Sequence, residues 1–220
     1  YFTLAKDKLT FAYLDGIPQR DKIHKRLTEL WNFERYSTPS KIGGRYFFFK
    51  NDGLQNHSVL YTTRDLSQKP SVLLDPNTFS KDGTVALSGW SVTDDGKHLA
   101  YSISEGGSDW VEWHVRNIAT GKDLPDIIKW SKFSGASWTK DGDGFYYSRY
   151  DEPSSDSALR SLNEFNKLYY HQLGTKQAAD KLVYERKDQK DWGFSGDVTD
   201  DGKYLIITVS KGTERKNRLY

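Results

Sequence analysis

The sequence predicts a mainly β protein, with about three and a half blades of a β-propeller preceded by an α-helix. The first observation is a repeated unit of a polar lead-in, an Asp/Gly turn and a run of β-branched or aromatic residues. The second is its period, because turn glycines lie 52, 48 and 58 residues apart at Gly44, Gly96, Gly144 and Gly202. The third is an aromatic content of 15%, since large rings suit half-exposed sheets.

Each copy of the repeated unit is expected to form a β-hairpin. The copies lie at residues 39–44, 91–97, 137–142 and 197–203. Their Gly-Gly and Asp-Gly pairs supply the positive φ angles that tight two-residue turns require. Strands joined by such turns at roughly 40–50-residue intervals are typical of propeller blades.

The region before the repeats has a different pattern. Residues 1–14 have an ambiguous pattern, and an extended tail is one interpretation of them. Residues 18–31 are predicted to be helical, because Ile23, Leu27 and Leu30 fall on one stripe and Pro18 suits a first helical turn. This stripe requires a covering surface, and the blades need not provide it.

The strands are then expected in order along the chain. Blade one would hold 45–50, 58–63 and 71–74; blade two would run from Ala86 through 99–104, 112–117 and 125–129; blade three would hold 135–138, 145–149, 167–173 and 181–185; blade four would begin near Asp197 and continue through 204–210. In blade four, Leu205, Ile207 and Val209 alternate with more polar positions. Residues 152–166 are predicted to be a Ser/Asp-rich loop inserted into blade three. Such a ring is not closed, so we expect further chain or another molecule to complete it.

Composition excludes several classes of function. The net charge is only +2, with 32 basic and 30 acidic residues, which argues against a nucleic-acid groove. No apolar stretch is long enough to cross a membrane, so no membrane partner is expected. The absence of cysteine excludes disulfides and thiolate metal sites, and suits the cytoplasm as well as a periplasm. The first residues contain neither an initiator Met nor a signal-peptide core, and the chain stops at Tyr220 inside a predicted strand, so both ends are expected to be cut.

No catalytic constellation is visible in the residues themselves. Ser108 follows two glycines, but Trp110 occupies a position where a nucleophile elbow requires a small residue, so a hairpin turn is the better interpretation. The segment that begins at Asp141 resembles a calcium loop, but Tyr146 occupies the position that requires glycine. The histidines show no metal-ligand spacing, and no metal or other cofactor is expected; they are His24, His57, His98, His114 and His171.

Several segments are more specific than the repeat. They include 53–56, 74–77, 82–87, 107–111, 124–126, 132–134 and 168–171. In their residues and in their order along the chain, these segments resemble the prolyl oligopeptidase family of serine peptidases. The resemblance covers most of residues 28–220.

The resemblance implies a two-domain serine endopeptidase that cleaves short peptides after proline. A seven-bladed propeller would be inserted into an α/β-hydrolase domain and would control access of proline-containing oligopeptides to the active site. Residues 1–32 would be the end of the N-terminal helical segment of the hydrolase domain, and residues 33–220 would be blades one to part of four. The Ser/Asp/His triad would lie outside this sequence, in the C-terminal hydrolase portion, so residues 1–220 alone are expected to be inactive. Family habit suggests a monomer in the cytoplasm or periplasm.

One site residue follows from the resemblance. The resemblance implies that Phe133, in the segment Lys132-Phe133-Ser134, corresponds to an aromatic residue of the propeller. In the family, this residue forms part of the site for the substrate side chain two positions before the proline. The alternative is that Phe133 is an ordinary packing aromatic. For the chain as a whole, the alternative is a free-standing propeller that binds partner proteins without catalysis. A sugar- or calcium-binding propeller is a third hypothesis, which lacks ligand spacing.

Overall fold

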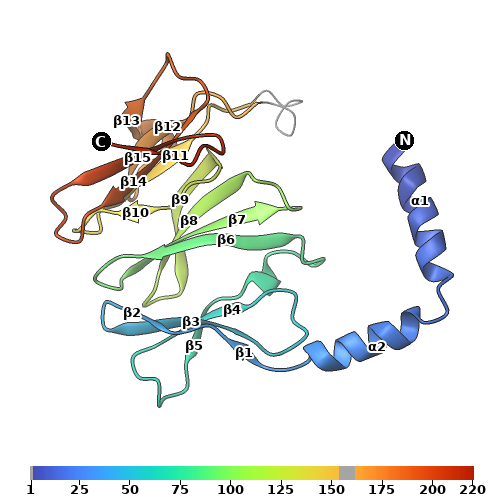
Figure 1. Cartoon of the computed structure of the whole chain (residues 1–220). Coiled ribbons are helices and arrows are strands. Elements are labelled where there is room, and N and C mark those ends of the chain that lie inside the picture. The colour runs from blue at the N-terminus through green and yellow to red at the C-terminus, as the bar shows by residue number, and fades with distance from the viewer. Residues whose placement is uncertain (1, 154–161) are drawn as a thin grey trace.

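The structure is a computed structural model that describes residues 2–153 and 162–220. Figure 1 shows four antiparallel sheets that follow one another along the chain, with two helices reaching away from the first sheet. Each sheet corresponds to one predicted blade, so the mainly β fold built from successive blades is confirmed. The loop predicted at 152–166 includes residues 154–161, which lie outside the described residues.

Each blade is a meander in which neighbouring strands are also consecutive in sequence, except that β1 and β2 both pair with β3. Blade one contains β1 (Arg35–Tyr36), β2 (Ser40–Ile42), β3 (Arg45–Asn51), β4 (Val59–Thr63) and β5 (Ser71–Leu74); blade two contains β6 (Val85–Val92), β7 (His98–Glu105), β8 (Val111–Asn117) and β9 (Lys122–Ser131); blade three contains β10 (Ser137–Trp138), β11 (Gly144–Arg149), β12 (Lys167–Gln172) and β13 (Lys181–Glu185); blade four contains β14 (Trp192–Val198), β15 (Leu205–Lys211) and β16 (Arg218–Leu219). Two short 3₁₀ turns, η1 (Pro76–Thr78) and η2 (Gln177–Ala179), lie in the connections.

Two helices precede the blades, where the sequence predicted one. The helix predicted at residues 18–31 is confirmed as α2 (Arg20–Trp31), although it begins after Pro18, which lies before the N-cap residue Gln19 and not in the first helical turn. The extended tail predicted for residues 1–14 is wrong, because this segment forms α1 (Phe2–Asp15). Residues 2–15 contain no glycine or proline, and Gly16 and Pro18 then end the helix. The apolar residues of α1 do not form one stripe, which is why periodicity gave no helical signal.

The repeated turns have one geometry in blades two, three and four. In blade two, the Thr93 N–H donates to His98 O at 3.0 Å, and the Thr93 hydroxyl donates to Asp95 Oδ1 at 2.8 Å. The corresponding hydroxyls of Thr139 and Thr199 donate to Asp141 and Asp201. The hairpins of these three blades are confirmed, but their loops are longer than the predicted two residues, because a β-turn is followed by a single left-handed glycine. In blade one the two-residue turn is confirmed, since Ile42 pairs with Arg45 and both Gly43 and Gly44 have positive φ angles.

In the repeated turn of blade three, the left-handed glycine is Gly142, with a φ of 74°, and not Gly144 as the spacing suggested. Gly144 is the first residue of β11 and has a different reason to lack a side chain. A Cβ at Gly144 would lie 2.2 Å from His171 O. The backbone of β12 therefore approaches β11 too closely for any other residue.

The hydrophobic core is divided into three layers, each between two neighbouring blades. Its fully buried members include Phe47, Leu60 and Leu74 of blade one, Leu99, Trp113 and Ile128 of blade two, Phe145 and Leu168 of blade three, and Val209 of blade four. The predicted alternation in β15 is confirmed, because Leu205 and Ile207 pack with Val209 while Ile206 is 37% exposed. Packing between blades therefore holds the array together.

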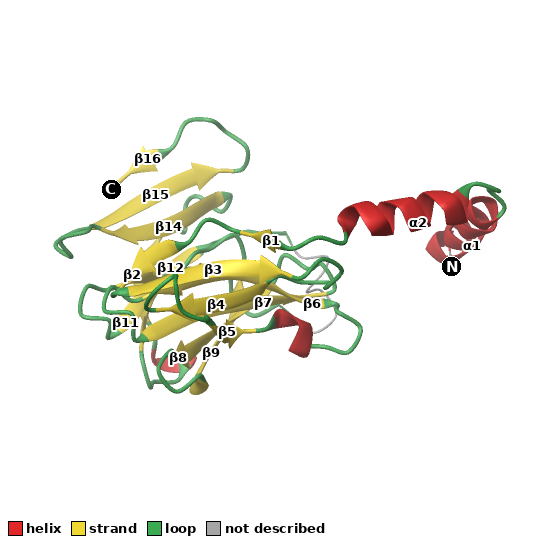
Figure 2. Ribbon diagram, turned by 90° about the horizontal axis from the view of Figure 1, so that it is seen from below, coloured by secondary structure: helices red, strands yellow, loops and turns green. Residues whose placement is uncertain are grey.

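The blades have two distinct ends. We call one the turn end, because it carries the Thr-x-Asp-Gly loops, on the left in Figure 1. We call the other the helix end, because α2 leads there into β1, where Arg35 pairs with Asn51, the last residue of β3. Figure 2 shows the helices projecting away from the blades on this side.

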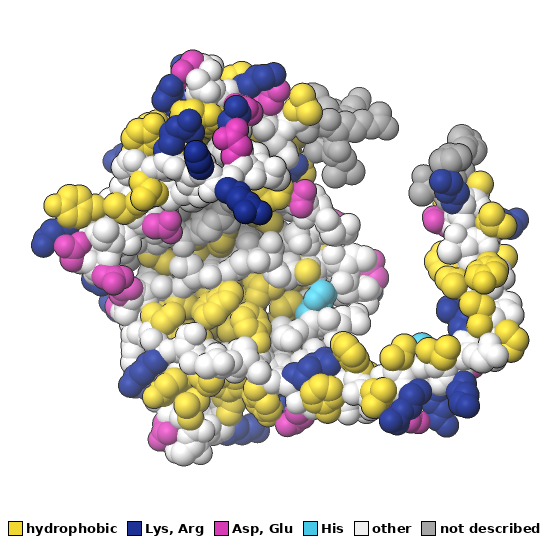
Figure 3. Space-filling view, viewed as in Figure 1, with side chains coloured by type: hydrophobic (Ala, Val, Ile, Leu, Met, Phe, Trp, Pro, Cys, Tyr) yellow, Lys and Arg dark blue, Asp and Glu magenta, His cyan; other side chains and the backbone are white. Residues whose placement is uncertain are grey.

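The helices bury little of their apolar surface within the described residues. Ile23, Leu27 and Leu30 of α2 are each more than half exposed. In Figure 3, hydrophobic side chains lie along the edge of α2 that faces the open space beside the blades, and Lys and Arg lie along the opposite edge. Neither of the described helices is long and apolar enough to cross a membrane.

Candidate functional site

Phe133 lies at the helix end of blade three. The Oγ of the next residue, Ser134, accepts a hydrogen bond of 2.8 Å from the N–H of Ser148, close to the end of β11. The Phe133 side chain is 70% exposed, so it is not packed into the core formed by the described residues. An exposed aromatic ring on a loop is available to contact another molecule or another part of a larger protein.

The local structure explains why the chain projects Phe133 outward. Pairing of β10 with β11 reaches only as far as Ser137 and Tyr146, so the next peptide groups of β11 lack a strand partner on this side. Two serine hydroxyls take the place of that strand. Ser131 Oγ donates to Ser148 O at 2.7 Å, while Ser134 Oγ accepts from Ser148 N. Residues 131–134, which we call the arch, are therefore fixed at both ends, with Lys132 and Phe133 at its tip.

The backbone at the arch is strained. Phe133 has a φ of 53° and Trp130, immediately before the arch, has a φ of 64°. Bulky residues in the left-handed region cost about 1–3 kcal/mol each and persist where surrounding contacts fix them. Two such residues within four positions indicate that the arch is held in place for its geometry, because a relaxed loop would not adopt it.

The arch forms one side of a pocket of about 590 Å³ between blades three and four. Phe133, Tyr150, Trp192 and Phe194 provide aromatic lining, and Asn163, Asp191 and Thr213 provide polar groups. A pocket with several aromatic side chains and a few polar groups suits a small organic group or a peptide side chain.

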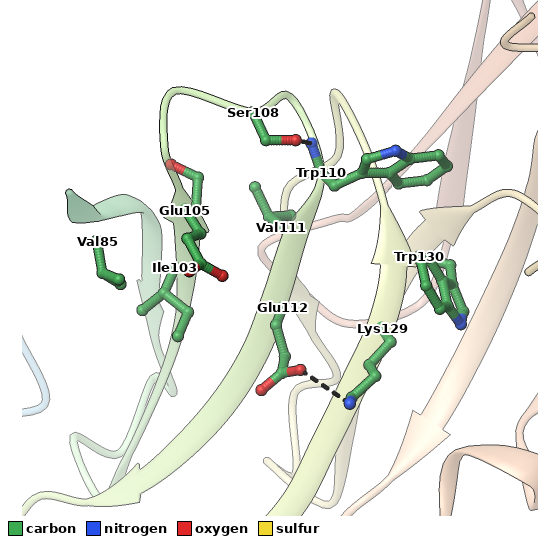
Figure 4. Close-up of a pocket in the computed structure, with 10 residues that line it drawn as sticks. Val85, Ile103, Glu105, Ser108, Trp110, Val111, Glu112, Lys129 and Trp130 are labelled. Carbon is green, nitrogen blue, oxygen red and sulfur yellow. Dashed lines mark hydrogen bonds and ion pairs between the residues drawn. The ribbon is translucent and has the colours of Figure 1, made fainter. Parts of the chain in front are cut away.

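A second pocket of about 510 Å³ lies on blade two at the same end (Figure 4). Val85 and Ile103 line one side, and Glu112 and Lys129, which form an ion pair at 3.4 Å, line its base. Trp110 and Trp130 border it on the side of blade three.

The cluster of Trp110, Trp130 and Tyr150 supports the arch. The ring of Trp110 meets those of Trp130 and Tyr150 edge to face, with ring centroids 5.8 and 6.1 Å apart. Tyr150 N–H also donates to Trp130 O at 3.0 Å. The Lys132 ammonium lies 4.0 Å from the centre of the Trp110 ring and donates to Asn163 Oδ1 at 2.9 Å. Aromatic and cation–π contacts thus join the arch to the residues next to β8 and β11.

A second polar cluster is buried between blades two and three. His171 Nε2 lies 3.0 Å from Asp126 Oδ1, and His171 Nδ1 lies 2.7 Å from Asp180 Oδ1. All three side chains are fully excluded from solvent. Tyr147 Oη donates to Asp180 Oδ2 at 2.6 Å, and Gly174 N donates to Asp126 Oδ1 at 2.6 Å.

This arrangement sets the protonation of the imidazole. Ionised carboxylates only accept hydrogen bonds, so both ring nitrogens of His171 carry protons in this geometry. Burial lowers the pKa of His171, but the hydrogen bonds to Asp126 and Asp180 outweigh it and raise this pKa to about 9. Burial raises the pKa of Asp126, but the hydrogen bonds from His171 and Gly174 are stronger and lower it overall. Burial, followed by the bond to Asp180, raises the pKa of Tyr147.

The position of this cluster indicates a structural role, because its three side chains are buried between blades two and three and away from the arch. Periodicity and spacing gave no signal for it, because Asp126 and His171 are 45 residues apart. Both residues end segments that carry the resemblance noted above, but the segments did not indicate that they meet. The contact follows only from the stacking of two blades.

The other candidates take the places that the sequence predicted. Ser108 lies in the turn between β7 and β8, where its Oγ accepts from Trp110 N at 3.1 Å, as expected for a hairpin turn. Asp141 accepts from Thr139 in a repeated turn. Within residues 2–153 and 162–220, no group of three or more His, Asp or Glu side chains is arranged to hold a metal ion.

The comparisons identify what this chain is similar to. The family described as prolyl oligopeptidase, N-terminal β-propeller domain, matches residues 2–220. The prolyl endopeptidase of Elizabethkingia miricola is 44% identical over 213 residues, which is 97% of this chain and 30% of that protein. The prolyl endopeptidase of Elizabethkingia meningoseptica is 43% identical over the same shares of both chains. The chain thus spans about a third of the length of these relatives.

Solved structures agree with the sequence comparisons. Prolyl oligopeptidase B from Galerina marginata, bound to a 25mer macrocyclization substrate, superposes with a TM-score of 0.88 at 30% identity and covers 96% of this chain and 32% of that one. A structure from a study of two prolyl endopeptidases and their inter-domain dynamics gives a TM-score of 0.78 at 37% identity, over 99% of this chain and 30% of that one.

Proposed function

The chain belongs to the prolyl oligopeptidase family and forms its N-terminal propeller portion, and on this basis we propose that it controls peptide access in a proline-specific serine endopeptidase. Nucleophilic attack by an activated serine, with a histidine base and an oxyanion hole, would be supplied by a C-terminal α/β-hydrolase portion of the same protein. The propeller portion would contribute an entrance that admits proline-containing oligopeptides and one wall of the substrate site.

The observation that carries this proposal is the position of Phe133. Its ring is 70% exposed, lies at the helix end and borders a pocket with aromatic lining. In the proposed enzyme, Phe133 forms the apolar wall for the substrate side chain two positions before the proline. Burial of a bulky apolar side chain against this ring would favour binding by excluding water from both surfaces.

The two parts of the chain would have different roles. We assign residues 1–32 to the N-terminal helical segment of the hydrolase domain, and residues 33–220 to blades one to part of four of a seven-bladed ring. The exposed apolar stripe of α2, at Ile23, Leu27 and Leu30, supports this assignment because the blades leave it uncovered. The hydrolase portion is the proposed partner for this stripe.

A substitution at Phe133 tests the site in the full-length protein. We expect Phe133→Ala to lower kcat/KM on the order of tenfold for peptides with phenylalanine two positions before the proline, because the loss of the ring removes apolar contact. Peptides with glycine at that position should be cleaved with unchanged kcat/KM. The matched control is Phe165→Ala, since Phe165 also has a left-handed backbone (φ 59°) but borders a different pocket. Equal kinetics of Phe133→Ala and the parent enzyme across the series would remove Phe133 from the substrate site.

A second experiment tests the division of labour between the two portions. Residues 1–220, purified alone, are expected to show no hydrolysis of a proline-linked chromogenic peptide. The full-length protein should cleave it. Turnover by residues 1–220 that persists through purification and titrates with a serine-reactive phosphonate would contradict the assignment of the triad to the C-terminal portion.

A further inference from the structure

We propose that Lys132 is a positioning residue, whose buried ammonium holds the arch so that Phe133 faces substrate. This inference rests on the proposed role of Phe133 and extends it to a residue that does not itself touch the substrate.

Lys132 is an unusual residue for its surroundings. It is only 8% exposed, and within the described residues no carboxylate forms an ion pair with it. Asp191, which lines the same pocket, is 3.7 Å from Lys211. Removing an ammonium group from water is unfavourable unless specific contacts replace the water. Here those contacts are the face of the Trp110 ring at 4.0 Å and Asn163 Oδ1 at 2.9 Å.

These contacts connect both ends of the strained segment to one fixed ring. Trp130, at the start, packs edge to face with Trp110, and Lys132 lies over the same Trp110 ring. The backbone between them is therefore fixed relative to Trp110. Phe133 follows directly, with its φ of 53°, so its direction is set by where Lys132 is anchored.

The strain gives this anchor a function. A phenylalanine released from its neighbours would leave the left-handed region for a more favourable backbone conformation. The serine hydroxyls fix Ser131 and Ser134, but they do not contact the side chains at the tip. Among the contacts of the described residues, those of the Lys132 ammonium with Trp110 and Asn163 are the ones that hold the tip of the arch. They therefore oppose relaxation of the backbone at Phe133. Loss of its charge would leave the arch attached to β11 but allow Phe133 to turn away from the pocket.

The test compares Lys132→Met with Lys132→Arg in the full-length protein. Methionine keeps an unbranched apolar chain but loses the cation–π contact and the hydrogen bond, whereas arginine keeps both kinds of interaction. We expect Lys132→Met to raise KM several-fold, and up to about tenfold, for peptides with phenylalanine two positions before the proline. The value of kcat, and both constants for glycine peptides, should stay near those of the parent. Lys132→Arg should restore the parent KM.

Further variants separate this inference from the proposed function. If Phe133→Ala changes the preference for phenylalanine but Lys132→Met does not, the positioning role is wrong and the proposed site stands. If Phe133→Ala itself has no effect, the proposed site is wrong. The double variant Phe133→Ala/Lys132→Met should resemble Phe133→Ala alone, because a positioning residue has nothing left to position; additive losses would contradict the proposal.

A milder substitution guards against misfolding of the lysine variant. Asn163→Ala removes the hydrogen-bond acceptor from an exposed residue and leaves the packing around Trp110 in place. We expect it to reproduce the rise in KM for phenylalanine peptides in smaller degree, about twofold. If Asn163→Ala and Lys132→Met lower kcat equally for phenylalanine and glycine peptides, Lys132 supports the fold in general and the proposal is overturned.

Discussion

His171 on β12 and Asp126 on β9 form an ion pair across the boundary between two blades, with Nε2 and Oδ1 3.0 Å apart and both side chains fully buried. Asp180 holds the other ring nitrogen at 2.7 Å, so the imidazole lies between two carboxylates. Asp126 Oδ2 is buried without a hydrogen-bond partner among the described residues. His171 therefore faces both carboxylates of the cluster and joins Asp126 of blade two to Asp180 of blade three.

The first prediction concerns the stability of this boundary. His171→Ala should lower the free energy of unfolding by about 3–5 kcal/mol, because removal of one member of a buried ion pair leaves the other charges unpaired. Lys140→Ala provides the matched control, since Lys140 pairs with Asp94 across the same two blades but both side chains are more than half exposed. The control should cost less than about 1 kcal/mol. Urea unfolding followed by tryptophan fluorescence measures the free energy of unfolding of both variants. Equal decreases in the two variants would show that the buried cluster stabilises the fold no more than an exposed ion pair does.

The second prediction is a dependence of stability on pH. The pKa of His171 is raised from an ordinary value of 6.5 to about 9, so the folded protein retains a proton that the unfolded chain releases. This stabilisation is fully present below pH 6.5 and is lost as the pH rises through 9. The pKa of Asp126 is lowered, so its contribution is present above its ordinary value of 3.8 and is lost as the pH falls below it.

Unfolding by urea at pH 6 and at pH 9.5 measures the alkaline loss. His171→Gln should remove most of the difference between the two pH values. His24→Gln is the control, because His24 lies exposed on α2 and should leave the difference unchanged. A pH dependence that is the same in His171→Gln as in the parent would assign the effect to other groups.

The third prediction concerns the close approach of two strands. A Cβ at residue 144 would lie 2.2 Å from His171 O and 2.5 Å from Tyr170 Oη. Gly144→Ala should therefore destabilise the fold by about 1–3 kcal/mol or more, because the clash includes backbone that cannot move without shifting β12. Gly135→Ala is the control, since no atom lies within 4 Å of its added Cβ; it should be neutral within about 0.5 kcal/mol. Thermal unfolding of the two variants side by side decides the matter, and a neutral Gly144→Ala would contradict the close approach.

The fourth prediction tests the proposed cover of the apolar stripe on α2. Leu30, 51% exposed, should tolerate Leu30→Asp in residues 1–220 alone, with less than about 0.5 kcal/mol change in the unfolding of the blades. In the full-length protein, the same change should lower the melting temperature by several degrees, because an unpaired charge would be buried against the hydrolase portion. Lys25→Asp, on the opposite face of α2, is expected to have little effect in either protein. An unchanged melting temperature for full-length Leu30→Asp would show that the stripe remains uncovered.

Much of the architecture could be predicted because its signals are local. The turn at Thr93–Gly96 is closed by contacts within six residues, and the alternation of Leu205, Ile207 and Val209 follows from the period of a strand. The predictions were wrong where the local signal was weak, or where one residue fitted two different structural roles. Residues 2–15 lacked a stripe although they are helical, and Gly144 lay near a predicted turn although its constraint comes from β12.

The site was predictable only in part. The resemblance singled out Phe133, and the structure places this residue exposed beside a pocket, but its role as a substrate contact stays a prediction. Nothing local indicated that Lys132 would lie over Trp110, because the two residues are brought together by the pairing of β8 with β9 and the bulge that precedes the arch. The strain at Trp130 and Phe133 was likewise invisible, since backbone angles of this kind are imposed by the surrounding structure.

By itself, the sequence determined the blades, their order and the turns that join their strands, because hydrogen bonding within a hairpin and alternation along a strand involve residues near one another in the chain. Only the tertiary structure decided that Asp126, His171 and Asp180 share one buried charge cluster, and that the Lys132 ammonium lies over the Trp110 ring. Both arrangements arise from packing, which acts between residues far apart in sequence and depends on distances that no local pattern specifies.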